Sequence, residues 1–336
     1  MGKVTSFSKD ELERETQRLF SKLQLAGWNR QSCALIAPLT LEINKLKKEK
    51  NAIILAHTYV TPDLIFGVAD FTGDSYALSK NASETKATTI VFAGVRFMAE
   101  TAKILNPQKT VLIPSLEAGC SLADHITADD VRKLKKQHPG VPVICYVNTS
   151  AEVKAESDVC CTSANAGKII KALPGKEVIF LPDYFMAKNL TEMTGKKVYS
   201  WDAKCIVHED FDAHAIEEFR KEHPGLKILA HTECEPAVVH LADLAGGTSD
   251  MVNYVKKSDA KEFMLVTECG LGDRMRVEFP GKKFIGSCGL CPYMKKNSLA
   301  TILQALKNPS RDQVVEIPEE IRLRAKKALD RMFELS

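Results

Sequence analysis

The sequence has no long apolar run and no large excess of charge of one sign. No apolar stretch approaches the ~18 residues of a membrane-spanning helix. The charged segment Met1 to Arg18 also lacks the apolar core of a signal peptide. The 46 basic and 43 acidic residues are well mixed, so no basic patch indicates nucleic-acid binding. We therefore expect a cytoplasmic protein with no membrane and no nucleic-acid partner.

Low-complexity segments and long linkers are also missing. At 336 residues the chain exceeds the ~250–300 residues at which a single core stops growing, so several modules are expected, packed as one unit. Residues 1–50 are predicted to form an N-terminal helical extension. Its first helix begins with a capping-box pattern, Ser8 with Glu11, and its second runs from about Thr40 to Lys50.

Cysteine, in contrast, is abundant, with ten residues. In a reducing compartment this number argues against a disulfide scaffold and favours metal or redox chemistry. Three of the cysteines recur at nearly constant spacing, since 85 residues separate Cys120 from Cys205 and 86 separate Cys205 from Cys291. Each follows a short strand-like run and a loop.

Other patterns recur with steps of 85 to 89 residues. Three apolar strands end in a polar ring, at His57, Tyr146 and His231. Three turns precede helices, in Gly73-Asp-Ser75, Cys161-Thr-Ser163 and Gly247-Thr-Ser249. Because several patterns repeat with nearly the same step, the sequence indicates three copies of one module. Each copy would contribute one cysteine to a shared centre.

The modules alternate strands and helices with short loops, which predicts βαβ units and parallel sheets. Right-handed crossovers place the loops after the strands on one edge, where α/β sheets bind ligands. The predicted fold class is α/β, with three pseudo-symmetric Rossmann-like modules, each with a small parallel sheet, around a central site. The predicted modules are 51–139 with Cys120, 140–225 with Cys205 and 226–295 with Cys291, and the C-terminal helices in 296–336 pack on them.

The central site is predicted to hold a metal cluster, because three convergent thiolates repel one another unless a cation binds. Zinc and iron–sulfur clusters both usually take four protein ligands. Three cysteines on a [4Fe–4S] cluster would leave one iron open as a Lewis acid. The alternative is that Cys120, Cys205 and Cys291 are ordinary buried cysteines, and the repeat argues against it.

The remaining cysteines lie outside the register. Six of them are expected to be core or loop thiols: Cys33, Cys145, Cys160, Cys161, Cys234 and Cys269. Cys288 is ambiguous, because it could replace Cys291 as a ligand, pair with it in a redox switch, or line the site.

Polar residues follow the matched strand ends. His57 and His231 are followed two residues on by Tyr59 and Glu233, and histidine and glutamate suit proton transfer near neutral pH. Module two offers Tyr146 and Asn148 there, which supply hydrogen bonds to carboxylates or carbonyls. A single histidine at a strand end is more often structural, but matched positions in three modules favour function.

Helix starts provide a second group of candidates at Ser75, Ser163 and Thr248. Helix capping alone explains Ser and Thr at such positions. Helix N-termini also bind anions, so three of them around one cavity would suit a substrate with several carboxylates or a phosphate. His208, three residues after Cys205, is expected beside the metal.

Eight motifs, in order from about Asn51 to the C-terminus, resemble those of the quinolinate synthase family. They are Ile54-Leu-Ala-His57, Gly73-Asp-Ser75, Val91-Phe-Ala-Gly-Val-Arg-Phe-Met-Ala-Glu-Thr-Ala-Lys103, Glu117-Ala-Gly-Cys-Ser-Leu-Ala-Asp124, Tyr146-Val-Asn-Thr-Ser-Ala-Glu-Val-Lys154, Cys205-Ile-Val-His-Glu209, His231-Thr-Glu-Cys-Glu235 and Cys291-Pro-Tyr-Met294. The resemblance implies three similar α/β modules around a central [4Fe–4S] cluster.

The resemblance also implies a reaction and roles for single residues. The implied enzyme condenses iminoaspartate with dihydroxyacetone phosphate to quinolinate, phosphate and water in de novo NAD synthesis, in functional coupling with the enzyme that supplies iminoaspartate. Cys120, Cys205 and Cys291 would hold the cluster, with one iron open to substrate. The residues expected to bind substrate are His57, Ser75, Tyr146, Asn148, Ser163, His231, Glu233 and Thr248. The residues expected to transfer protons are His57, Tyr59, His208 and Glu233.

The chain departs from the family pattern at several points. It has His57-Thr-Tyr-Val60 where many members have His-Tyr-Tyr-Gln, and His231-Thr232-Glu233 where His-Pro-Glu is more usual. Some members carry a third cysteine before the final motif. This chain has none near Gly286, which puts a redox switch built on that extra pair in doubt.

Three other functions are compatible with parts of this pattern. A radical enzyme resembling the diphthamide-synthesis proteins would share the three modules, but the His-x-Glu and Tyr-x-Asn pairs suit a small dicarboxylate better. A non-enzymatic protein with structural zinc would be colourless, whereas an iron–sulfur protein is brown. A plain sugar-phosphate-binding module would bind phosphate regardless of its cysteines.

Overall fold

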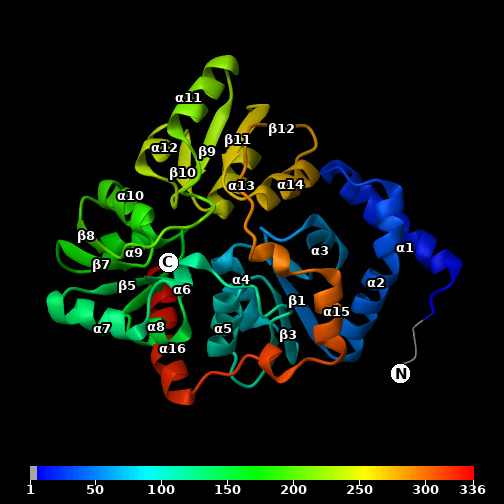
Figure 1. Cartoon of the computed structure of the whole chain (residues 1–336), viewed down its shortest axis with the longest axis horizontal. Helices are drawn as coiled ribbons and strands as arrows, with labels where there is room; N and C mark the ends of the chain where they lie inside the picture. The colour runs from blue at the N-terminus through cyan, green and yellow to red at the C-terminus, as the bar shows by residue number, and fades with distance from the viewer. Residues whose placement is uncertain (1–5) are drawn as a thin grey trace.

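Three small sheets form the framework of the computed structural model, which describes residues 6–336 (Figure 1). Each sheet has four parallel strands, and the order within each is second, first, third, fourth along the chain. The predicted α/β fold with three like modules is thereby confirmed. The residue boundaries of the modules stay predictions. Residues 1–5, which belong to the predicted N-terminal extension and to the charged segment Met1 to Arg18, lie outside the described residues.

The strands are short and mostly buried. The first sheet contains β1 (Ala52–His57), β2 (Phe71–Gly73), β3 (Thr89–Ala93) and β4 (Thr110–Leu112). The second contains β5 (Val143–Tyr146), β6 (Val159–Cys161), β7 (Glu177–Leu181) and β8 (Lys197–Ser200). The third contains β9 (Lys227–His231), β10 (Leu244–Gly246), β11 (Glu262–Val266) and β12 (Lys283–Phe284). The central strands are almost continuously apolar, as parallel strands covered on both faces require.

Helices connect the strands. In the first module they are α3 (Pro62–Gly67), α4 (Ser75–Glu84), α5 (Arg96–Leu105), α6 (Ser121–Asp124) and α7 (Ala128–Gln137). In the second they are α8 (Ala151–Ala155), α9 (Ala166–Ala172) and α10 (Tyr184–Thr194), and α11 (Ala213–Glu222), α12 (Pro236–His240), α13 (Thr248–Lys257) and α14 (Cys269–Glu278) follow. The ends of the chain contain α1 (Lys9–Leu23), α2 (Arg30–Glu49), α15 (Leu299–Lys307), α16 (Glu319–Leu335) and the 3-10 turns η1 (Gln24–Ala26), η2 (Met294–Lys296) and η3 (Arg311–Gln313).

An aspartate at the same place in each module fixes the second strand beside the first. Asp70, Asp158 and Asp243 precede β2, β6 and β10, and the carboxylate of each accepts a hydrogen bond from a backbone N–H at the start of the neighbouring central strand, at 2.7 to 2.9 Å. A carboxylate that accepts a backbone N–H also satisfies a donor at the strand end. These aspartates are a further register of the threefold repeat, with steps of 88 and 85 residues.

Two local predictions differ from the structure. The strands β2, β6 and β10 were missed, because each is a three-residue segment shortly before a helix and was interpreted as part of the turn that leads into that helix. The second helix was expected to begin near Thr40, but α2 begins at Arg30 and contains Pro38. Proline usually ends a helix, which is why the sequence suggested a later start. The predicted capping box of Ser8 and Glu11 is confirmed.

The hydrophobic core is continuous through the first two sheets and separate at the third. The largest cluster of buried apolar side chains contains residues of the first two sheets together with α15 and α16. Two smaller clusters cover the faces of the third sheet, and a fourth joins α1 to α2. Helix α16 packs against α8 and β6, whereas α15 packs against α2 and β3. In Figure 1 the third module stands apart from this larger body, with the strand ends of all three directed toward the middle.

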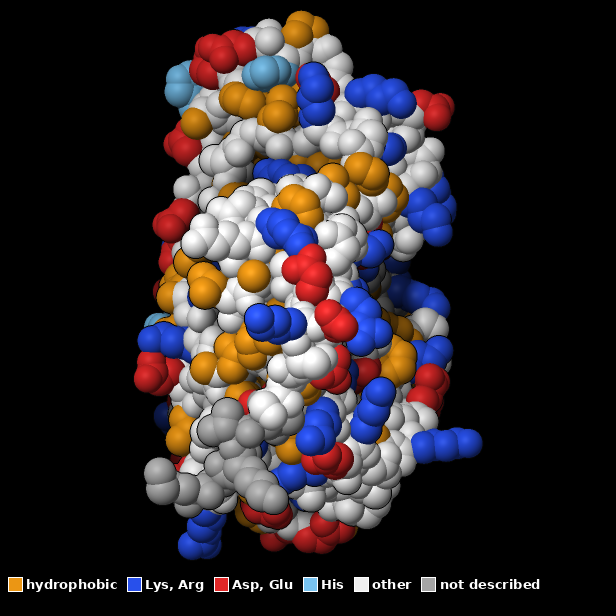
Figure 2. Space-filling model, turned by 90° about the vertical axis from the view of Figure 1, so that its right-hand side faces the viewer, with side chains coloured by type: hydrophobic (Ala, Val, Ile, Leu, Met, Phe, Trp, Pro, Cys, Tyr) orange, Lys and Arg blue, Asp and Glu red, His pale blue; other side chains and the backbone are white. Residues whose placement is uncertain are grey.

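The surface on the side of the N-terminal helices carries both signs of charge. Figure 2 shows lysine and arginine side chains interspersed with aspartate and glutamate on this face, with no field of one sign. Within residues 6–336, no helix combines the length and the apolar character needed to cross a membrane.

Candidate active site

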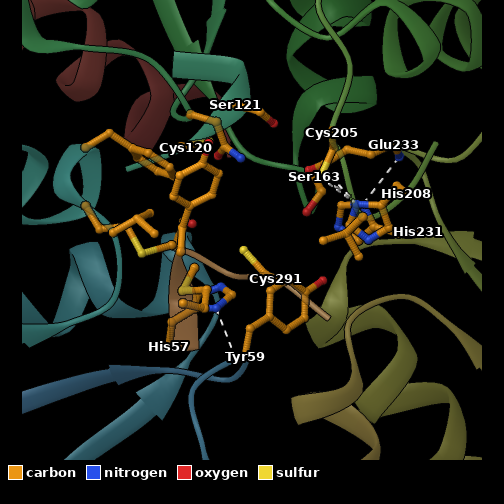
Figure 3. Close-up of a pocket in the computed structure, with 18 of the residues that line it drawn as sticks. His57, Tyr59, Cys120, Ser121, Ser163, Cys205, His208, His231, Glu233 and Cys291 are labelled. Carbon is orange, nitrogen blue, oxygen red and sulfur yellow. Dashed lines mark hydrogen bonds and ion pairs between the residues drawn. The ribbon is translucent and has the colours of Figure 1, made fainter. Parts of the chain in front are cut away.

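A cavity lies where the carboxyl ends of the three sheets meet. Every residue predicted to bind a metal or substrate or to transfer a proton lines it: His57, Tyr59, Ser75, Cys120, Tyr146, Asn148, Ser163, Cys205, His208, His231, Glu233, Thr248 and Cys291. Figure 3 shows side chains from all three modules directed into the same space. The structure brings these residues together, and their separate roles stay predictions.

The three repeated cysteines reach the cavity from matching loops after the last strand of each sheet. Cys120 precedes the short helix α6, Cys205 follows β8, and Cys291 follows β12. All three are free and partly buried. Burial raises the pKa of Cys120 to about 12, and it also raises the pKa values of Cys205 and Cys291. Without a cation these thiols keep their protons, so a metal that binds them must displace the protons.

This donor set fits an iron–sulfur cluster. Three free thiols at equivalent positions face one cavity, and thiolates are the usual ligands of such clusters. The cavity walls beside them are largely apolar, with lining residues that include Val95, Phe97, Met98, Val207, Tyr293 and Met294. Apolar surroundings limit the access of water to a metal site.

The two histidines at the strand ends are held in the same way. Nδ1 of His57 accepts a hydrogen bond from the backbone N–H of Tyr59 at 3.2 Å, and Nδ1 of His231 accepts one from the N–H of Glu233 at 3.3 Å. Burial lowers the pKa of His57 to about 3 and that of His231 to about 4, so both rings are neutral near pH 7. The hydrogen of each ring then lies on Nε2. Each histidine therefore offers one N–H donor to an oxygen of a ligand.

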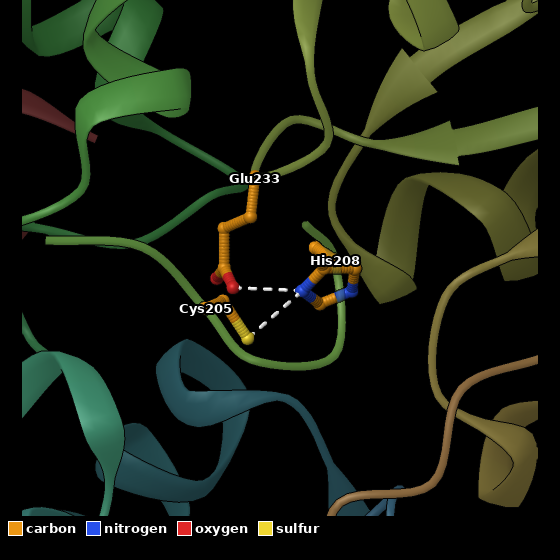
Figure 4. A group of neighbouring side chains, drawn as sticks. All are labelled: Cys205, His208 and Glu233. Atoms are coloured by element: carbon orange, nitrogen blue, oxygen red, sulfur yellow. Dashed lines mark hydrogen bonds and ion pairs between the residues drawn. The ribbon is translucent and has the colours of Figure 1, made fainter. Parts of the chain in front are cut away.

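Glu233 is a buried carboxylate with a partner on each oxygen. Oε1 accepts a hydrogen bond from the hydroxyl of Tyr146, and Oε2 lies 2.9 Å from Nδ1 of His208 (Figure 4). Burial opposes ionisation, but His231, His208 and these hydrogen bonds outweigh it and hold the pKa of Glu233 well below its usual range. Glu233 is thus ionised near pH 7, and both of its carboxylate oxygens are engaged by neighbouring side chains.

His208 lies between Glu233 and Cys205. Its Nδ1 is 3.2 Å from Sγ of Cys205, and its ring stacks on that of His231 with centroids 4.5 Å apart. One ligand atom each from Cys205, His208 and Glu233 lie within 4.8 Å of one another, so this trio is a possible site for a single metal ion. His208 was predicted to lie beside the metal, and the structure places it beside Cys205, a predicted metal ligand.

The predicted anion-binding residues lie at helix starts. Ser75 is the first residue of α4 and Thr248 the first of α13, whereas Ser163 lies in the loop before α9. Asp74 caps α4 and also accepts a hydrogen bond from the hydroxyl of Ser249, which joins the first module to the third. Asn148 has a buried Oδ1 that finds no hydrogen-bond partner among the described residues. A buried polar atom without a partner indicates a place for a ligand or water.

The prediction for Cys269 is wrong, because this residue is not a free thiol. It forms a disulfide with Cys288, with Cα atoms 5.0 Å apart. Backbone hydrogen bonds between the segments of Thr267 to Cys269 and Gly289 bring the two cysteines together. Spacing along the chain does not reveal such a contact. Cys288 is therefore not paired with Cys291, and it lines a smaller pocket with Cys269 outside the main cavity.

One polar residue near the site was missed. Thr267 directly follows β11, is fully buried, and hydrogen-bonds both Tyr59 and His208. The corresponding residues after β3 and β7 are Gly94 and Pro182, which carry no polar side chain. The repeat therefore gave no signal at this position.

Comparisons with known proteins agree with this geometry. Residues 41–334 match the family model of the quinolinate synthetase A protein. A quinolinate synthase of Sinorhizobium fredii is 44% identical over 328 residues, which cover 96% of this chain and 89% of the relative. A quinolinate synthase 2 of Mesorhizobium japonicum is 51% identical over 288 residues, 86% of this chain and 88% of the relative. A quinolinate synthase of Xylella fastidiosa is 48% identical over 293 residues, 87% and 86% of the two chains.

Proposed function

This chain belongs to the quinolinate synthetase A family and is an enzyme that makes quinolinate for NAD synthesis, and we propose that it condenses iminoaspartate with dihydroxyacetone phosphate and releases phosphate and water. The observation that supports this proposal most is the shared cavity. Three free cysteines from equivalent loops line it together with the ionised Glu233 and two neutral histidines. A radical enzyme of the same architecture and a zinc protein without activity are not favoured by the relatives found.

The cofactor in this proposal is a [4Fe–4S] cluster held by Cys120, Cys205 and Cys291. With only three protein ligands, the bound cluster supplies one open iron as a Lewis acid for the loss of water. The thiol pKa values, raised by burial, mean that the three thiolates form together with metal binding.

The substrates are small anions, and the cavity has donors for them. Nε2–H of His57 and Nε2–H of His231 suit the carboxylate oxygens of iminoaspartate. The starts of α4 and α13, at Ser75 and Thr248, offer free backbone N–H groups and a positive dipole end, which favour a carboxylate or phosphate. Asn148 and Ser163 add neutral polar contacts.

Proton transfer in this proposal centres on Glu233. A condensation that ends in an aromatic ring removes protons from carbon and nitrogen and protonates departing hydroxyl groups. Glu233 accepts a proton at the carboxylate, while the hydroxyl of Tyr146 and Nδ1–H of His208 hold that carboxylate in place. His57 and Tyr59, whose rings meet edge to face with centroids 4.6 Å apart, are the second pair of candidates.

The proposal is tested by quinolinate formation from iminoaspartate and dihydroxyacetone phosphate by anaerobically purified protein. Product that disappears when the iron is chelated supports both reaction and cofactor. Protein with about four irons per chain that makes no quinolinate but cleaves S-adenosylmethionine contradicts the reaction in favour of the radical enzyme. Colourless protein with one zinc at Cys205, His208 and Glu233 contradicts the cluster.

The cellular setting is also proposed. Because iminoaspartate hydrolyses in water, a functional coupling to the enzyme that supplies it is expected, with the cytoplasm as the common compartment. A pull-down that recovers no iminoaspartate-forming enzyme, together with unchanged product yield when the two enzymes are separated by a membrane, would contradict the coupling.

A further inference from the structure

The segment that follows β5 turns sharply beside the cavity and presents Tyr146 and Asn148 to it. Within the turn, the backbone N–H of Thr149 donates to the carbonyl of Val147 at 2.8 Å, and the Thr149 hydroxyl donates to the carbonyl of Tyr146 at 2.9 Å. Oδ1 of Asn148 is buried and has no hydrogen-bond partner within residues 6–336. It needs a donor, which a bound substrate can supply.

Lys154 of the short helix α8 holds this turn. Its side chain is fully buried, and Nζ donates to the backbone carbonyl of Val147 at 2.8 Å and to that of Thr149, with Oγ1 of Thr149 at 3.5 Å. The two carbonyls belong to the residues on either side of Asn148. Lys154 does not line the cavity, whereas Asn148 does. Lys154 therefore grips the backbone around Asn148 without touching the space where substrate binds.

The burial of Lys154 indicates that its donors are needed. To bury an ammonium group costs free energy unless hydrogen bonds compensate for the lost water, and a methionine could fill a similar volume without that cost. An ammonium group has three N–H donors, and the turn offers three oxygens to them. Nζ also lies 5.6 Å from the centroid of the Phe97 ring, which lines the cavity. Lys154 thus lies directly behind the cavity wall.

The third module holds its matching turn in the same way. Nδ2 of Asn189, a buried residue of α10, donates to the carbonyls of Thr232 and Cys234 at 2.9 and 2.8 Å, on either side of Glu233. Asn148 and Glu233 both lie two residues after the end of a central strand. Two different side chains thus bind the same pair of carbonyls in two modules. The shared feature is a fixed backbone under a residue that faces the ligand.

We propose that Lys154 is a positioning residue, which fixes the amide of Asn148 in the cavity by holding the two backbone carbonyls beside it. This inference rests on the proposed function, because that function assigns Asn148 to the binding of a substrate. Without the ammonium group, the carbonyls of Val147 and Thr149 lose a buried donor, and the turn can rearrange to find another. The Asn148 amide then has no fixed direction before substrate binds, and ordering it weakens binding.

The effect of losing Lys154 is expected in substrate binding, as a higher KM with little change in kcat. Asn148→Ala removes the same contact directly, so it should raise the KM of the same substrate. Once residue 148 is alanine, Lys154 has no amide to position, and the two substitutions should not add. A purely structural role of Lys154, or a general attraction of its charge for anionic substrates, would persist without the Asn148 amide.

The test measures iron content, kcat and the KM of both substrates for anaerobically purified holoenzyme. The variants are Lys154→Met, Asn148→Ala and the double variant. Lys103→Met is the matched control, because Lys103 is also a buried lysine whose Nζ donates to two backbone carbonyls, those of Pro107 and Lys109, at 3.2 and 3.1 Å. Lys103 does not line the cavity. If Lys154→Met does not fold, Lys154→Leu replaces it with the same criteria.

We expect Lys154→Met and Asn148→Ala each to raise the KM of the same substrate about tenfold, with kcat within about threefold and iron content unchanged. The double variant should lie within about twofold of Asn148→Ala, and Lys103→Met within about twofold of wild type. The inference is overturned by a Lys154→Met KM within twofold of wild type, by loss of its iron, by effects on different substrates, by additive effects in the double variant, or by an equal effect of Lys103→Met. Failure of the proposed function is recognised separately, since the wild-type protein with its iron would then make no quinolinate.

Discussion

The carboxylate of Glu268 accepts a hydrogen bond from the backbone N–H of Cys291, at 3.1 Å. Glu268 is fully buried, and the same oxygen lies 2.8 Å from Nζ of Lys295, while its second oxygen accepts the N–H of Gly270. Lys295 also donates to the backbone oxygen of Tyr59. One buried ion pair thus fixes the loop of a predicted cluster ligand and the strand end of the first module.

Glu268→Ala should lower both stability and iron content. Removal of one partner of a buried ion pair typically costs about 3–5 kcal/mol, because the other charge is left without a partner. The loop of Cys291 also loses its acceptor. Thermal unfolding and iron analysis check this, with Glu117→Ala as control, since Glu117 forms an exposed ion pair with Lys296. Equal iron content and equal melting temperature in the two variants would contradict the role of Glu268.

Cys120→Ser, Cys205→Ser and Cys291→Ser should each lose the cluster and the activity. A serine hydroxyl is a poor ligand for iron in place of a thiolate. Iron content and visible absorbance after anaerobic purification check the prediction. Cys33→Ser is the matched control, because Cys33 is a buried free thiol of α2 that packs against α1, away from the cavity. Full iron content in any of the three site variants would remove that residue from the ligand set.

The disulfide of Cys269 and Cys288 predicts the number of reactive thiols. Cluster-free protein unfolded without reductant should show eight free thiols, and reduced protein should show ten. Cys288→Ser should keep its iron, because Cys291 and not Cys288 lines the cavity. Ten free thiols before reduction would contradict the disulfide, and loss of iron in Cys288→Ser would make Cys288 the ligand.

Glu233→Gln should keep the cluster and slow turnover by about 10²–10⁴-fold, the usual contribution of a positioned acid or base. The amide has nearly the same shape, and it can still accept from Tyr146, but it cannot take up a proton. Iron content and steady-state kinetics check this, and Glu235→Gln, close by in sequence and without a place in the cavity wall, is the control. A near-normal kcat for Glu233→Gln would exclude Glu233 from the mechanism.

Stability of the metal-free protein should fall as pH drops below about 6.5. The folded-state pKa values of His57 and His231, about 3 and about 4, lie below the ordinary value of 6.5. At a pH between the folded-state pKa values and 6.5, both histidines are protonated in the unfolded chain and neutral in the folded protein. A fall in pH through this range therefore favours unfolding. Urea unfolding at pH 7 and pH 5 measures the difference, and His57→Gln with His231→Gln should reduce it. An unchanged difference in the double variant would contradict the prediction.

The repeat explains how much of the site the sequence revealed. Residues at repeated positions, such as Cys120, His57 and Thr248, were found because each has counterparts in the other modules. Thr267 was not found, since its counterparts are Gly94 and Pro182. The disulfide of Cys269 and Cys288 was missed for another reason, because only the folded backbone places the two residues together.

For the fold, too, some elements were predicted from the sequence and others were missed. The central strands were predicted because each is a clear apolar run, whereas β2, β6 and β10 are three-residue segments shortly before a helix. Their position depends on Asp70, Asp158 and Asp243, whose carboxylates bind the neighbouring strands. An aspartate before a short strand has no distinct pattern in a single copy, and only comparison of the three modules makes it visible.

The shared strand order of the three sheets has a consequence for symmetry. A ring of three identical chains would place the same side chain at every strand end and would present a threefold-symmetric cavity. Because the three modules are joined in one polypeptide, each strand end can change without the others, and His57, Tyr146 and His231 now occupy equivalent positions. The cysteines and aspartates are the same in all three modules, whereas the side chains at the strand ends that line the cavity differ between modules. A cavity of this kind can hold two different small molecules in a fixed orientation, which a symmetric ring of one module could not do.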